Sequence, residues 1–126
     1  MAITQYFNLV NRSRAEVIGG FYAANAGQIQ TGVLVLAAAD RSLTLCGGTG
    51  KPDGFAEGLR QLVYAPTVLT LDAGEACNVI SGNVLVRTDA SFFYGGTLPA
   101  EGDVIYAAAN GLMDHTGGTY STTKLG

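Results

Sequence analysis

The stretch that decides the fold is Ser81-Gly-Asn-Val-Leu-Val-Arg-Thr-Asp-Ala-Ser-Phe-Phe-Tyr-Gly-Gly-Thr-Leu-Pro-Ala-Glu-Gly-Asp-Val-Ile-Tyr-Ala-Ala-Ala-Asn-Gly-Leu112. Short apolar and β-branched runs alternate in it with turn-forming residues, as in strands joined by tight connections. Asn110-Gly111 predicts a two-residue hairpin turn, because both central positions of a type I′ turn need a positive φ. We also predict a strand over Asp103–Ala107, and pairing of Val84–Arg87 with Phe92–Tyr94 across the turn between them.

The chain before this stretch continues the same pattern. Gly32–Cys46 predicts a hairpin with its turn at Asp40-Arg41-Ser42, and Cys77–Ile80 predicts a short strand. Leu59–Leu71 is β-branched and aromatic but is interrupted by Pro66, which cannot donate a backbone hydrogen bond, so we expect two strands or a broken edge strand. The predicted fold class is therefore all-β, a small antiparallel sandwich or barrel.

The domain organisation predicted from length is a single β domain over residues 1–126. Residues 1–24 mix polar and apolar side chains and predict an extended N-terminal arm or edge segment, ahead of a β core over residues 30–126. Within the arm, Ala15–Ala24 is consistent with a strand broken at Gly19-Gly20, and that glycine pair argues against the alternative of a short helix.

Composition limits the possible partners. Charged residues make up 13% of the chain, about half the usual ~25%, so much of the exterior is neutral or covered by another protein. The net charge of −3 disfavours nucleic acid, which needs clustered cations. No apolar run reaches the ~20 residues of a membrane span. Without a visible secretion signal, Cys46 and Cys77 are expected to be free thiols, although a disulfide between them stays open.

The residues that invite a catalytic interpretation do not form a recognisable site. Gly47–Lys51 resembles a phosphate loop but has Leu45 and Pro52 where that motif needs glycine and a hydroxyl residue. His115 stands beside Asp114, yet nothing in the sequence brings either to a cysteine nucleophile. We therefore predict a protein that is not an enzyme, with no catalytic residue, no cofactor and no metal site.

Consecutive aromatic residues raise the question of an interface. In a strand, Phe92 and Tyr94 would face one side and Phe93 the other, so the rings either bury both faces or leave one for another subunit or partner. Aromatic residues near the N-terminus raise the same question. The candidate interface residues are Tyr6, Phe7, Arg12, Arg14, Phe92, Phe93 and Tyr94.

Three segments resemble the small capsid decoration (cement) proteins of tailed bacteriophages. The first is Thr31-Gly-Val-Leu-Val35, a glycine followed by an apolar triplet that opens a hairpin. The second is Lys51-Pro-Asp-Gly-Phe55, a turn entering a short strand. The third is Gly102-Asp-Val-Ile-Tyr106 followed by Asn110-Gly-Leu112. The resemblance covers roughly residues 30–112, and the N-terminal and C-terminal segments match nothing comparable.

This resemblance implies a structural virion protein, made in the host bacterial cytoplasm and located on the capsid surface. It would bind the major capsid protein as a homotrimer and bridge neighbouring shell subunits, where many identical weak contacts add up by avidity. The alternative is a carbohydrate- or receptor-binding β module of a tail fibre or adhesin. Such a module usually stacks sugars on aromatic rings; the chain has no Trp, and Tyr22, Tyr64, Tyr94 or Tyr120 would have to serve.

Overall fold

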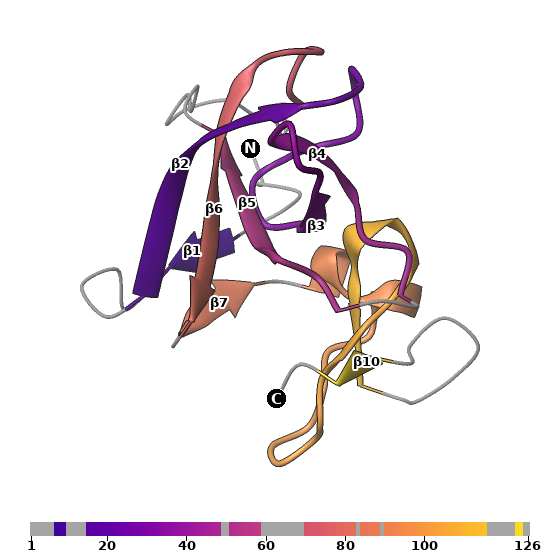
Figure 1. Ribbon diagram of the computed structural model, residues 1–126. Coiled ribbons are helices and arrows are strands. Elements are labelled where there is room, and N and C mark those ends of the chain that lie inside the picture. The colour runs from indigo at the N-terminus through magenta and orange to yellow at the C-terminus, as the bar shows by residue number, and fades with distance from the viewer. Residues whose placement is uncertain are drawn as a thin grey trace, which may run out of the picture.

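The computed structural model describes residues 7–9, 15–48, 51–58, 70–82, 84–88, 90–115 and 123–124. This part of the chain contains β-strands and short 3-10 turns, and no α-helix. The all-β fold class is thereby confirmed. The described residues form a closed barrel, a small three-stranded sheet and a two-stranded pair, arranged as Figure 1 shows.

The barrel consists of five strands in the order β2-β4-β3-β5-β6, with β6 returning to β2. Their bounds are β2 (Ala15–Ala23), β3 (Leu34–Ala37), β4 (Ser42–Leu45), β5 (Gly54–Gly58) and β6 (Ala76–Gly82). The β2–β4 pair is parallel and the others are antiparallel, so the barrel is mixed rather than purely antiparallel as predicted. The reason is topological: strand direction cannot alternate around a closed ring with an odd number of members.

The barrel interior forms a continuous apolar core. It joins side chains from all five barrel strands to residues from the loops and from the later part of the chain. Ile29, Val35, Leu43, Cys46 and Ala56 are fully buried. The remaining members of the core cluster are Ala23, Val33, Leu34, Leu71, Cys77, Val79, Phe92, Phe93, Ala107 and Met113.

Strand β2 includes the predicted break at the glycine pair. The register of β2 against β6 shifts between Ile18 and Phe21, and Gly20 has a φ of 90°, which a residue with a Cβ rarely adopts. The arm or edge segment predicted over residues 1–24 needs a correction here, because Ala15–Ala23 is a strand of the barrel wall. Residues 1–6 and 10–14 lie outside the described part of the chain.

The hairpin predicted over Gly32–Cys46 is confirmed as β3–β4, and the strand predicted over Cys77–Ile80 lies within β6. Most of the broken strand predicted over Leu59–Leu71 falls outside the described residues; at its end Thr70 forms an isolated bridge with Gln30.

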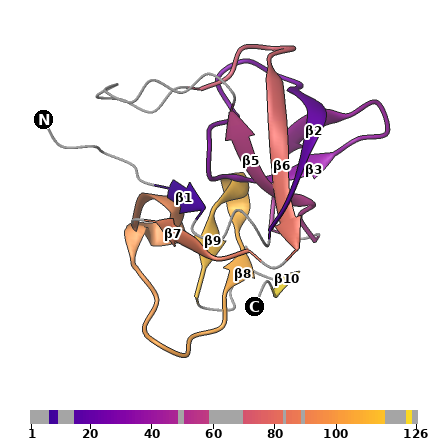
Figure 2. The same cartoon turned by 90° about the vertical axis from the view of Figure 1, so that its left-hand side faces the viewer.

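A second sheet has the order β10-β8-β9, with β8 (Tyr106–Ala107), β9 (Met113–Asp114) and β10 (Thr123–Lys124). The predicted Asn110-Gly111 turn joins β8 to β9, and its two residues have φ of 60° and 72°. The Gly111 amide donates to the Cys46 carbonyl at 2.8 Å, which ties this hairpin to the barrel (Figure 2).

The pairing predicted between Val84–Arg87 and Phe92–Tyr94 is wrong. Strand β7 (Val86–Thr88) pairs instead with β1 (Phe7–Leu9). Phe92 ends the 3-10 turn η1 (Ala90–Phe92) and Tyr94 begins η2 (Tyr94–Gly96), while Phe93 between them is extended and forms an isolated bridge with Met113. Gly95 and Gly96 have φ of 78° and 69°, so the chain turns directly after the aromatic residues instead of continuing as a strand.

Candidate interaction surfaces

The turn between β3 and β4 is fastened to β2 by a group of polar and aromatic side chains, the barrel-end cluster: Phe21, Tyr22, Asp40, Arg41 and Ser42. The Tyr22 hydroxyl donates to Asp40 Oδ2 at 3.0 Å. The Ser42 amide and hydroxyl donate to Asp40 Oδ1 at 3.1 and 2.7 Å. The Asp40 carboxylate therefore accepts hydrogen bonds on both oxygens, and it holds its own turn and β2 together.

These hydrogen bonds change the proton affinities of both partners. The pKa of Asp40 is lowered, first because the Ser42 hydroxyl and amide donate to its carboxylate and then because Tyr22 does. The pKa of Tyr22 is raised, chiefly because its hydroxyl proton is held by Asp40. Between the lowered pKa of Asp40 and the raised pKa of Tyr22, the tyrosine is therefore neutral and the aspartate is ionised. A hydrogen bond between two groups with such different pKa values suits a structural contact better than a proton-transfer site.

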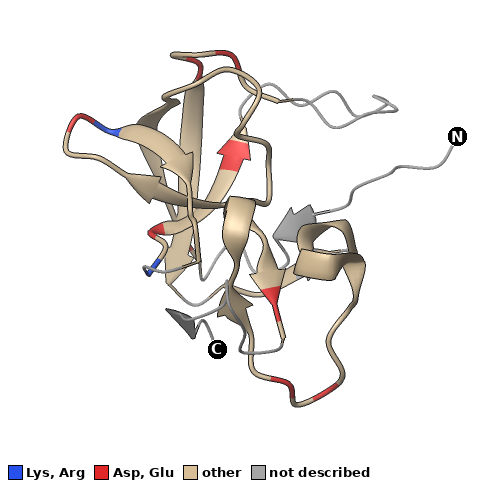
Figure 3. Ribbon diagram, turned by 90° about the vertical axis from the view of Figure 1, so that its right-hand side faces the viewer, with Lys and Arg blue, Asp and Glu red and all other residues tan. Residues whose placement is uncertain are grey.

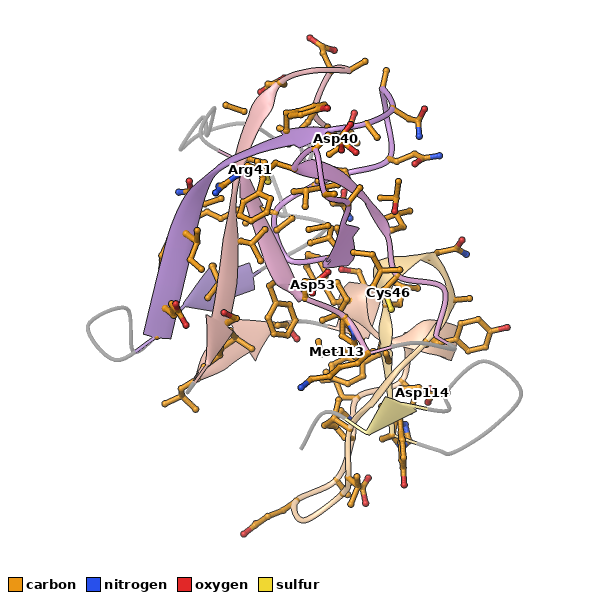
Figure 4. The ribbon with its side chains drawn as sticks, viewed as in Figure 1. Asp40, Arg41, Cys46, Asp53, Met113 and Asp114 are labelled. Atoms are coloured by element: carbon orange, nitrogen blue, oxygen red, sulfur yellow. The ribbon has the colours of Figure 1, made fainter. Side chains whose placement is uncertain are left out.

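Arg41 completes the cluster from the same turn. Its φ is 69°, and its guanidinium lies 5.3 Å from the centre of the Phe21 ring, within the range of a cation–π contact. Arg41 Nη1 also donates to the Gly19 carbonyl at 3.3 Å, next to the β2 bulge. Figure 4 shows Asp40 and Arg41 together at one end of the barrel, so a carboxylate and a guanidinium lie near each other there, and the guanidinium lies over the Phe21 ring.

A second candidate surface consists of η2 and the chain that follows it towards β8, named here the 94–103 loop. It extends away from the barrel strands in two perpendicular views (Figures 1 and 2). Tyr94 and Leu98 are 38% and 53% exposed, which places two large hydrophobic side chains on this loop in solvent. Before the loop, Phe92 and Phe93 are buried in the core, and after it Ile105 packs against the core, so both ends are anchored.

The tip of the loop is an ordered turn. The Ala100 amide donates to Asp103 Oδ2 at 2.8 Å, and the Asp103 amide donates to the Ala100 carbonyl at 3.1 Å. Asp103 Oδ2 also lies 3.5 Å from His115 Nδ1, directly after β9. The turn is thereby closed on itself and connected to the second sheet. Figure 3 shows acidic positions on this loop, which carries Glu101 and Asp103.

The candidate interface residues fall in different places. Phe92 and Phe93 are 2% and 7% exposed, so both rings belong to the core, whereas Tyr94 is exposed. Alternation along a strand does not apply, because Phe92 and Tyr94 lie in separate 3-10 turns and only Phe93 between them is extended. Phe7 begins β1. Tyr6, Arg12 and Arg14 lie outside the described residues.

The cysteines and the histidine, which are the other candidates for chemistry, also lie in the described part of the chain. Cys46 and Cys77 are buried, and their thiols are not joined in a disulfide bond. His115 lies beside Asp103, and its backbone amide donates to Asp114 Oδ1 at 2.8 Å. Within the described ranges, no group of three or more His, Cys, Asp and Glu side chains is arranged to hold a metal ion. No helix in that part of the chain has the length and apolarity needed to cross a membrane.

Sequence reasoning missed the barrel-end cluster as a unit. The sequence predicts a turn at Asp40-Arg41-Ser42 and offers Tyr22 as a ring for stacking sugars, and nothing in the sequence joins the two. The available signal was the Asp-x-Ser pattern, in which a carboxylate accepts from the amide two residues later. The parallel pairing of Tyr22 with Ser42, which brings the hydroxyl to the carboxylate, appears only in the folded barrel.

Comparison with known proteins does not assign this chain to a family. No protein-family model, no curated protein and no solved structure matches this chain. The described geometry and the sequence are therefore the basis for any functional proposal.

Proposed function

We propose that this protein is a non-enzymatic structural virion protein that binds the outside of an assembled phage capsid and bridges neighbouring major capsid proteins. The observation that carries the proposal is the low charge of a chain that already has a closed barrel with its own core: only 13% of its residues are charged. An exterior with so few charges suits a molecule whose surface is partly covered by other proteins.

The three segments that resemble decoration proteins support the proposal by their positions. The first precedes and enters β3, the second leads into β5, and the third reaches the start of β8 and includes the turn between β8 and β9. All three therefore lie at or beside the ends of strands, where a shared fold would preserve them. The resemblance further supports a homotrimer, and low charge supports self-association.

The test is the composition of purified particles. Mass spectrometry of gradient-purified virions, from the phage whose genome encodes this chain, should detect the protein in a fixed ratio to the major capsid protein. Electron microscopy of particles with and without it should show added density on the outer surface. Detection in the lysate but never on particles would contradict the proposal. Light scattering of the purified protein checks self-association, which a stable monomer at micromolar concentration would contradict.

A second candidate is the carbohydrate-binding module, and the barrel-end cluster is the observation that favours it. Tyr22 lies beside the Asp40 carboxylate and Phe21 lies beside the Arg41 guanidinium, and sugar sites combine aromatic faces with hydrogen-bonding groups of this kind. Glycan-array binding that is lost in Tyr22→Ala and kept in Tyr94→Ala would establish this reading. An array without signal would leave the structural role as the remaining candidate.

A further inference from the structure

We propose that the 94–103 loop is the element that docks on the capsid shell, and that it fits an apolar depression bordered by Lys or Arg side chains of the major capsid protein. The inference rests on the proposed function, because it names the contacting part of the same binding event. Three properties of the loop carry it: its exposed hydrophobic side chains, its ordered tip and its acidic charge.

The hydrophobic side chains supply the attraction. Leu98 is 53% exposed and Tyr94 is 38% exposed, and both lie on a segment that extends from the barrel (Figure 1). Residues 94–98 and 100–103 are all exposed, so part of each of these two side chains reaches solvent. A leucine that enters an apolar pocket of a partner gains the free energy of removing its surface from water.

The ordered tip lowers the entropy cost of binding. Two hydrogen bonds close the turn between Ala100 and Asp103, and the Asp103 carboxylate also approaches His115 beside the second sheet. At its base the loop begins next to the buried Phe93, which bridges to Met113 of β9. A loop held at its base and at its tip loses less conformational freedom on docking than a free segment of the same length.

The acidic residues of the loop favour a partner surface with positive charge. Glu101 and Asp103 lie at the tip, within five positions of Leu98, and residues 94–103 contain no Lys or Arg. A surface of opposite charge would meet this tip with complementary potential and steer it to its site. The loop therefore fits a basic rim around an apolar depression, and binding should weaken as salt screens the charges.

The experiment measures binding of purified protein to particles assembled from the major capsid protein alone. Leu98→Ser is compared with Leu85→Ser, since Leu85 is 57% exposed but lies outside the loop. Glu101→Gln is compared with Glu16→Gln, an exposed residue of β2. We expect Leu98→Ser to weaken binding about tenfold or more, and Glu101→Gln to weaken it several-fold with a smaller salt dependence, while both controls bind like the wild type.

The outcomes separate this inference from the proposed function. If the wild type binds and Leu98→Ser and Glu101→Gln match their controls, the docking loop is wrong and the capsid role stands. Equal weakening by Leu98→Ser and Leu85→Ser would also overturn the loop assignment. If the wild type does not bind at all, the proposed function and the loop inference both fail. Circular dichroism melting of each variant confirms that binding is compared among folded proteins.

Discussion

Cys77 illustrates how burial fixes the chemistry of a single residue. Its thiol lies in β6, is 1% exposed, and donates to the carbonyls of Glu57 and Asn78 at 3.4 and 3.2 Å. Burial raises the pKa of Cys77 to about 11, because an apolar surrounding disfavours the thiolate. A thiol held protonated in this way is a packing residue rather than a nucleophile.

We predict that Cys77 resists thiol reagents in the folded protein. In a Cys46→Ala background at pH 7.5, labelling of the native protein should be at least ~100-fold slower than labelling of the urea-unfolded chain. A pKa two units above the ordinary 9.0 leaves that much less thiolate, and burial adds to the effect. Stopped-flow absorbance with a disulfide reagent measures both rates. Equal rates would show that the thiol is accessible and ordinary.

The same pKa sets the sign of a pH effect on stability. The folded state binds the thiol proton more tightly than the unfolded chain, so this stabilisation is fully present below pH 9 and is lost as the pH rises towards 11. Because of Cys77, the unfolding free energy should therefore fall as the pH rises from about 9 to about 11. The Cys77→Ala variant should lack this part of the pH dependence.

At the scale of elements, the β8–β9 hairpin depends on one close approach. A Cβ at Gly111 would lie 2.8 Å from the Leu34 carbonyl oxygen and 2.9 Å from Leu45 Cδ2, and the residue has a φ of 72°. The hairpin turn is thus pressed against β3 and β4 at a place where only glycine fits. This contact, with the hydrogen bond to Cys46, joins the second sheet to the barrel.

We predict that Gly111→Ala destabilises the protein more than Gly74→Ala. Gly74 has a φ of 80° but no atom within 4 Å of its Cβ position, so its replacement costs only the left-handed backbone, about 1–2 kcal/mol. Gly111→Ala adds overpacking, about 1–3 kcal/mol more. Urea unfolding followed by fluorescence or circular dichroism measures both. Equal losses would mean that the turn is not in contact with the barrel.

At the scale of the whole molecule, stability comes from the barrel core rather than from the loops at its ends. Leu43 of β4 is fully buried in the cluster that joins the barrel to Phe92 and Met113. Leu85, between β6 and β7, is 57% exposed. The two positions therefore carry the same side chain and differ in its burial, so the same substitution at each tests the effect of burial.

We predict that Leu43→Ala lowers the unfolding free energy by about 2–5 kcal/mol, because it leaves a cavity in the barrel. Leu85→Ala should change it by no more than about 0.5 kcal/mol. Denaturant melts of the two variants against the wild type give the comparison. Similar losses for both would contradict the closed, packed barrel as the centre of stability.

The sequence by itself determined the local structure of this protein. Asn110-Gly111 predicted a turn with two positive φ values, Gly19-Gly20 predicted a break in a strand, and the apolar runs of Gly32–Cys46 predicted a hairpin; all three are present. Each of these depends on backbone preferences of neighbouring residues, which a short stretch carries within itself.

Only the tertiary structure decided which strands pair and which side chains meet. The stretch from Ser81 to Leu112 predicted one hairpin too many. Phe92-Phe93-Tyr94 has the composition of a strand, but the core buries the first two rings and 3-10 turns lie on both sides of Phe93. The parallel β2–β4 pair and the meeting of Tyr22 with Asp40 depend on residues far apart in the chain. Long-range pairing is set by closure of the barrel and by burial of its core, and neither is encoded within a single segment.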